Sequence, residues 1–119
     1  MTPFGIKMRE LRAERHLTQQ QQADYLGVSV AYVSSLERGI RGRPSALMVD
    51  QLCVWLGLIW DDAENLKLLA SLSHPKPTID ARNTSPNAIY LANLLAQNIG
   101  RLDPGDCDAL IAEITKRRS

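Results

Sequence analysis

Several residue types that build specialised proteins are scarce in this 119-residue chain. Aromatic residues make up only 5% of it, so a folded core must be mostly aliphatic. There are two cysteines and two histidines, and neither Cys53 nor Cys107 has another cysteine or histidine at ligand spacing. Both cysteines lie in apolar helical patterns, so we predict small buried residues rather than a zinc site or a disulfide framework. We expect no metal and no cofactor.

Long apolar runs are missing as well. The longest apolar stretch is too short and too interrupted to span a bilayer. Near the start of the chain, Arg9 and Arg12 come before any long apolar run, which argues against a signal peptide. We therefore expect a cytoplasmic protein that has no contact with a membrane.

The sequence also lacks the patterns that are typical of enzymes. It has no phosphate-binding glycine loop, no metal cluster and no catalytic triad. His16 and His74 stand alone at the ends of helical segments, where a histidine is more often a cap than a catalyst. We predict that the protein is not an enzyme.

The net charge of +1 hides an asymmetry along the chain. Residues 1–45 contain seven Lys or Arg and four Asp or Glu, whereas residues 46–119 contain seven bases and nine acids. The first part is therefore the one that would meet a polyanion. On charge alone, an ordinary mixed surface explains these counts equally well.

Nearly every segment has the period of an α-helix, and none has the sustained alternation of a strand. Capping residues and helix breakers predict Pro3–Arg15, a helix from Thr18 to Gly27, one from Ser29 to Gly39, Ala46–Leu56, Trp60–Ser71, one from Ser85 to Gly100 and one after Asp103. Residues 40–44 are predicted as a loop, 75–85 as a connector or extended arm, and 116–119 as a frayed end.

Residues 18–39 have the features of a helix-turn-helix. Ala23 is a small residue where the second helix crosses the first, and Gly27, four residues later, tolerates the positive φ of the turn. Apolar residues beside and after the turn are Leu26, Val28, Val33 and Leu36. The exposed face of the second helix is small or polar, with Val30, Ala31, Ser34 and Ser35, so it can approach base edges. The pattern predicts a unit that places this helix in the major groove of double-stranded DNA.

This segment resembles the DNA-binding unit of the phage repressor and Cro family, also called the Xre family. The matching residues are Leu17-Thr18-Gln19, Ala23, Leu26-Gly27-Val28-Ser29, Val33 and Leu36-Glu37-Arg38-Gly39. The resemblance extends over about residues 4–58 and includes a later apolar stripe of Val49, Leu52, Cys53, Leu56 and Gly57. It implies an all-α fold with a five-helix, lambda-repressor-like DNA-binding head, followed here by a two-helix C-terminal extension.

The resemblance also implies which residues contact DNA. The expected contacts are Gln19, Ser29, Val30, Ala31, Tyr32, Ser34, Ser35, Arg38, Arg41 and Arg43. Gln19 and the helix start beside it are expected on a phosphate, and Tyr32 on a phosphate or over a sugar. Val30 and Ala31 stand where family members read bases with long polar side chains, and these short apolar residues reach only a thymine methyl. We therefore expect the three arginines to supply much of the binding through phosphates, with one loop arginine as a candidate to enter a groove.

Arg12 and Glu37 match the positions of an ion pair between the first and third helices of the family. We predict a partly buried structural pair, so that Arg12 does not contact DNA. The alternative is a surface pair, which contributes under about 1 kcal/mol.

The second half of the chain leaves more open. We divide the protein into a DNA-binding domain, residues 1–74, and a linker with a helical extension, residues 75–119. Trp55, Leu58, Ile59 and Trp60 form either core or a partner surface. The last two helices are expected to complete a homodimer, by packing across a two-fold axis or by swapping over residues 75–85.

The sequence is compatible with three functions. The first is a dimeric transcriptional regulator, more a repressor than an activator, that binds a pseudo-palindromic operator. The second is an antitoxin-type regulator whose C-terminal helices bind a partner protein. The third is an interaction protein that uses the fold without DNA.

Overall fold

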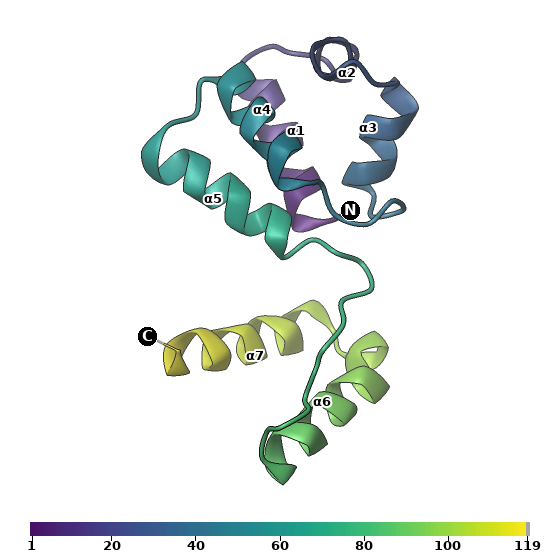
Figure 1. Cartoon of the computed structure of the whole chain (residues 1–119), viewed down its shortest axis with the longest axis vertical. Helices are drawn as coiled ribbons and strands as arrows, with labels where there is room; N and C mark the ends of the chain where they lie inside the picture. Colours follow the sequence, from purple (N-terminus) through teal and green to yellow (C-terminus); the bar gives the residue numbers. More distant parts are fainter. Residues whose placement is uncertain (119) are drawn as a thin grey trace. The chain divides into compact units, whose positions relative to one another are not determined.

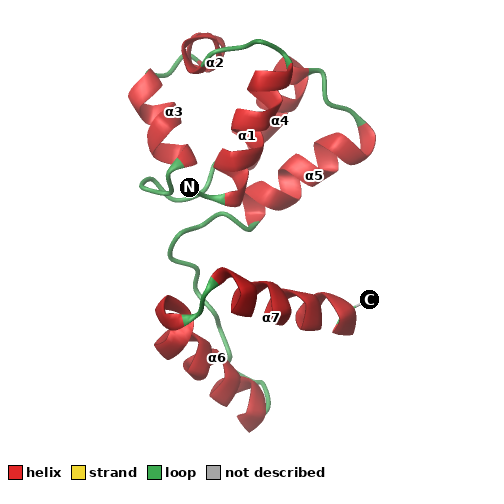
Figure 2. Cartoon of the chain, turned by 180° about the vertical axis from the view of Figure 1, so that it is seen from behind, coloured by secondary structure: helices red, strands yellow, loops and turns green. Residues whose placement is uncertain are grey.

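A computed structural model describes residues 1–118, and seven α-helices form its main elements (Figure 1). They are α1 (Pro3–Glu14), α2 (Gln19–Leu26), α3 (Val30–Glu37), α4 (Ala46–Leu56), α5 (Trp60–Ser71), α6 (Pro86–Asn98) and α7 (Pro104–Arg117). A short 3-10 helix, η1 (Ile99–Arg101), lies between α6 and α7. Residues 1–118 contain no strand, which confirms the predicted all-α class (Figure 2). The chain divides into two units between Pro77 and Thr78.

Local capping explains where most helices begin. Six of the seven α-helices follow a residue whose side-chain oxygen accepts an N–H of the first turn: Thr2, Thr18, Ser29, Ser45, Ser85 and Asp103. At Thr18 the predicted capping box is complete, because Gln21 Oε1 also accepts the Thr18 N–H at 2.8 Å. Only α5 begins without such a bond, after Ile59.

Local sequence also explains where helices end, but two of the predicted helix ends need correction. α3 ends at Glu37, and Gly39, two residues later, has a φ of 79°, which suits a residue without Cβ; the Ile40 N–H donates to the Ser35 carbonyl at 3.0 Å. α6 stops before the predicted Gly100, because its last turn tightens into η1. The predicted fraying at 116–119 is wrong for residues 116–117, which remain helical, whereas Ser119 lies outside the described residues.

In the first unit, α1 lies between α3 and α5 and packs against both, while α4 packs on α5 (Figure 2). The buried core comes from α1, α4, α5 and the short link between α4 and α5. Its members are Phe4, Met8, Leu11, Val49, Leu52, Cys53, Leu56, Leu58, Leu66 and Ala70. Burial also raises the pKa of the Cys53 thiol, as expected for a small core residue.

One sequence expectation needs correction, and one choice that the sequence left open is decided in part. Cys107 is only half-buried, because no residue of α7 lies in a closed core in the described chain. The apolar cluster around the start of α5 also splits into two parts. Leu58 is buried and Trp55 stacks on Tyr25 with ring centroids 5.8 Å apart. Trp60, by contrast, is 82% exposed and Ile59 is exposed as well.

The second unit exposes much of its apolar surface. Its large exposed hydrophobic residues are Ile79, Ile89, Tyr90, Leu91, Leu94, Ile99, Leu110, Ile111 and Ile114. Among the helices that the structure describes, none has the length and apolarity to span a membrane. The cytoplasmic location stays a prediction.

At Gly5 the backbones of α1 and α3 are in close contact. A Cβ on Gly5 would lie 2.3 Å from the carbonyl oxygen of Glu37 and 2.8 Å from its Cα. These are backbone atoms, which cannot swing aside as a flexible side chain would. The absence of a side chain at Gly5 therefore sets how closely the end of α3 approaches α1.

We expect Gly5→Ala to lower the free energy of unfolding of the first unit by at least about 2 kcal/mol, since helix packing must shift to admit the methyl group. Urea unfolding followed by the fluorescence of Trp55 and Trp60 measures it. Gly100→Ala is the matched control, because a Cβ there meets nothing within 4 Å. Equal stabilities of the two variants would contradict this account of Gly5.

Candidate nucleic-acid interface

The α2–α3 unit has the geometry of a helix-turn-helix. Ala23 is fully buried at the crossing of the two helices. Gly27 ends α2 with a φ of 72°, and the Val28 N–H donates to the Ala23 carbonyl at 3.0 Å. The small residue and the left-handed turn that the sequence predicted are therefore both in place.

α3 has one buried side and one exposed side. Val33, Leu36 and Glu37 are buried, and helical spacing places Ala31, Ser35 and Arg38 on the opposite side. Val30 and Ser34 lie on one flank and Tyr32 on the other, all half-buried. The side that faces away from the core is therefore made of small side chains and one arginine, which leaves the helix backbone accessible.

A buried ionic network fixes α3 against α1 and α2. Arg12 binds Glu37 through two hydrogen bonds, Nη1 to Oε2 at 2.5 Å and Nη2 to Oε1 at 3.1 Å. The Arg12 side chain is 7% exposed and that of Glu37 1% exposed. The ion pair implied by the family resemblance is therefore present and buried, and the alternative of a surface pair is wrong.

Two glutamines complete this network. Gln19 Nε2 donates to Glu37 Oε1 at 3.1 Å, and Arg12 Nη1 donates to Gln22 Oε1 at 2.6 Å. Sequence reasoning missed Gln22, although its spacing of four residues from Leu26 indicates an inward position on α2. Because the Gln19 amide is bound to Glu37, its expected contact with a phosphate stays a prediction.

The three predicted arginines differ in what they contact. Arg38 is exposed at the end of α3. Arg41 is exposed too, with its guanidinium carbon 5.3 Å from the centroid of the Tyr32 ring. Within residues 1–118, neither forms an ion pair with a carboxylate. Both positive charges are therefore available to a polyanion.

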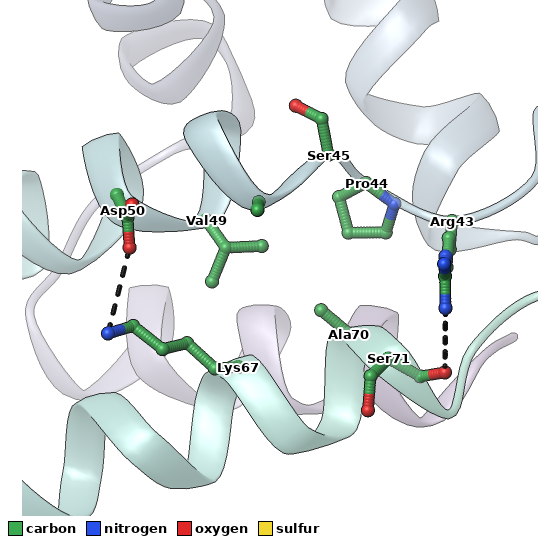
Figure 3. Close-up of a pocket in the computed structure, with 9 residues that line it drawn as sticks. Arg43, Pro44, Ser45, Val49, Asp50, Lys67, Ala70 and Ser71 are labelled. Carbon is green, nitrogen blue, oxygen red and sulfur yellow. Dashed lines mark hydrogen bonds and ion pairs between the residues drawn. The ribbon is translucent and has the colours of Figure 1, made fainter.

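Arg43 has a structural contact instead. Its Nη1 donates to the Ser71 carbonyl at 3.3 Å, at one end of a cavity of about 400 Å³ between the start of α4 and the end of α5 (Figure 3). Lys67 and Asp50 form an ion pair of 3.7 Å at the other end. Arg43 therefore ties the loop after α3 to α5, and its role on DNA stays a prediction.

The serines of the predicted site also differ. Ser29 is exposed, but its hydroxyl oxygen accepts the Tyr32 N–H at 3.1 Å, so it caps α3. Ser34 and Ser35 are half-buried. The structure thus gathers Ala31, Ser35 and Arg38 on one face of α3 and places Arg41 beside its flank.

The fold and this exposed helix define a helix-turn-helix head. The chain belongs to the helix-turn-helix domain family, whose model matches residues 3–66, just over half of the chain. This match confirms the predicted family. A 74-residue segment is 38% identical to an uncharacterized HTH-type transcriptional regulator, RghRB, of Bacillus subtilis (strain 168), and covers 62% of this chain and 50% of that protein.

A second relative is the HTH-type transcriptional repressor RghR of the same organism. It is 46% identical over 52 residues, which are 44% of this chain and 38% of the repressor. The matched segments thus span half or less of the length of these relatives.

We expect Arg12→Ala or Glu37→Ala to destabilise the first unit by about 3–5 kcal/mol, because each leaves the other charge buried without its partner. A double-mutant cycle on urea unfolding should give a large coupling energy. Glu10→Ala is the control, since Glu10 pairs with Lys7 on the surface at 4.0 Å and should contribute under about 1 kcal/mol. A coupling near zero would rule out a structural role for the buried pair.

Proposed function

We propose that the protein is a transcriptional regulator that binds double-stranded DNA and acts as a repressor. The observation that carries this proposal is the exposed side of α3, where small side chains lie beside the unpaired charges of Arg38 and Arg41 in a domain of the helix-turn-helix family. The names of both relatives, a regulator and a repressor, support it. In this proposal, residues 1–74 form the DNA-binding domain.

The shape of α3 suits entry into the major groove. Ala31 and Ser35 project little, so the helix backbone can approach the base edges closely. Val30 and Ala31 offer methyl groups, which suit the methyl group of thymine. Arg38 and the start of α2 are suited to phosphates, which position the head on the duplex without reading sequence.

Residues 75–119 serve, in this proposal, as a linker and a dimerisation extension. The exposed apolar residues of α6 and α7 are typical of a surface that binds another protein chain. Residues 78–119 contain five Lys or Arg and five Asp or Glu, so two copies of this unit do not repel each other through net charge. We therefore propose that a second copy of the chain binds this apolar surface.

A two-fold dimer would present two α3 helices to a pseudo-palindromic operator, with half-sites about 34 Å apart or a multiple of that distance. Occupation of such a site at a promoter would exclude the polymerase. The alternative that the same apolar surface supports is an antitoxin-type regulator, whose C-terminal helices bind a partner protein.

Selection of bound DNA from a random duplex pool tests the proposed function. We expect an enriched, two-fold symmetric motif and a binding constant that falls steeply with salt, because several arginines displace counterions. Arg38→Ala should weaken binding to all sequences alike and lower the salt slope by about one. Arg9→Ala, on the exposed side of α1, is the control and should change neither. Absence of any enriched motif would contradict DNA recognition.

Sedimentation tests the dimer. We expect the wild-type chain to be a dimer at micromolar concentration, and Leu94→Glu or Ile111→Glu to make it a monomer, because a buried charge would face the partner. Gln97→Glu, an exposed polar position of α6, is the control and should stay dimeric. A wild-type monomer whose mass is unchanged on DNA would refute the dimer, and co-purification of a bound protein would favour the antitoxin-type alternative.

A further inference from the structure

The first two residues of α3 cannot recognise a base pair by hydrogen bonds through their side chains. Val30 and Ala31 are short and apolar, and the Ser29 hydroxyl is bound to the Tyr32 N–H. A thymine methyl is the only base feature that suits Val30 and Ala31. Recognition of a guanine or adenine needs a long side chain with several donors or acceptors at the same depth in the groove.

The loop after α3 brings a long side chain with several donors, that of Arg41, beside the first turn of α3. The guanidinium carbon of Arg41 lies 5.3 Å from the centroid of the Tyr32 ring, and Tyr32 belongs to the first turn of α3. Arg38, by comparison, lies six residues further along, about 9 Å in helix rise. Of these two exposed arginines, Arg41 is therefore the one beside the first turn of α3. In the proposed function, this first turn is the part of the helix that enters the groove.

Both ends of this loop are fixed to the domain. At its start, Gly39 packs so closely on Thr2 that a Cβ there would lie 3.0 Å from Thr2 Cγ2. At its end, Arg43 donates to the Ser71 carbonyl at 3.3 Å and Pro44 is buried. Only residues 40–42 lie between these anchors. The backbone on both sides of Arg41 is therefore held against the domain, and the contact with Tyr32 orients its side chain.

We propose that Arg41 reads a guanine in the major groove and that Tyr32 is its positioning residue. The planar guanidinium donates two hydrogen bonds to O6 and N7 of guanine, the pairing that arginine geometry favours. Stacking on the Tyr32 ring holds the guanidinium in one orientation, so less side-chain freedom is lost on binding. This inference rests on the proposed DNA-binding function and adds a specificity-determining contact to it.

Random-pool selection with variants of the full chain tests the proposal. The wild type should enrich a guanine at one position of each half-site. Arg41→Ala and Arg41→Lys should both lose this preference, with affinity for the guanine-containing site falling roughly 10- to 100-fold, because lysine keeps the charge but not the two-pronged geometry. Tyr32→Ala should weaken the same preference, whereas Tyr32→Phe, which keeps the ring, should retain it. Arg38→Ala is the control and should leave the motif unchanged.

The opposite outcome is a phosphate contact. In that case Arg41→Lys binds like the wild type, and Arg41→Ala weakens all sequences alike while the salt slope falls by about one. Either result overturns base reading by Arg41. A guanine preference that Tyr32→Ala leaves intact overturns the positioning role. If the wild type enriches no motif, the proposed function and this inference fail together, whereas an enriched motif that is indifferent to Arg41 refutes only the inference. Thermal unfolding of each variant shows that it is folded.

Discussion

The buried carboxylate of Glu37 is the constraint on which the head depends. Its side chain accepts hydrogen bonds from Arg12 of α1 and Gln19 of α2, and its backbone carbonyl accepts both the N–H and the hydroxyl of Thr2. One residue at the end of α3 is thus tied to two other helices and to the start of the chain. A charge removed from water is tolerated only with such complete pairing, which makes the arrangement specific.

The orientation of α3 follows from this network together with close packing at Gly5. Because Glu37 turns inward beside Val33 and Leu36, the residues half a turn away must face solvent. Among these are Ala31, Ser35 and Arg38. The interface is therefore exposed as a consequence of how its opposite side is held, and a rigid helix loses little freedom on binding DNA.

The two units differ in how far they bury their apolar residues. The first encloses a mostly aliphatic core, and polar contacts hold α3 in place. In the second, α6 and α7 have no buried residue in the described chain, and many of their leucines and isoleucines are exposed. In the proposed dimer, association with another copy would bury this apolar surface. Sequence specificity would then depend on two heads and on the shape of the DNA between them as well as on direct contacts.

Much of the fold is determined by the sequence alone, because caps, breakers and helical periodicity act within a few residues. Thr18 with Gln21, and Gly27 at the turn, already predict where α2 begins and ends. The family resemblance added the pairing of Arg12 with Glu37. Only the tertiary structure revealed the contacts of Gln22, Arg41 and Arg43, because each has a partner from another element of the fold. The exposure of Trp60 and the half-burial of Cys107 were likewise decided by which apolar faces pack against a neighbour in the fold. The sequence thus determined a helix-turn-helix with a chemically poor recognition helix, and the tertiary structure placed an arginine beside it.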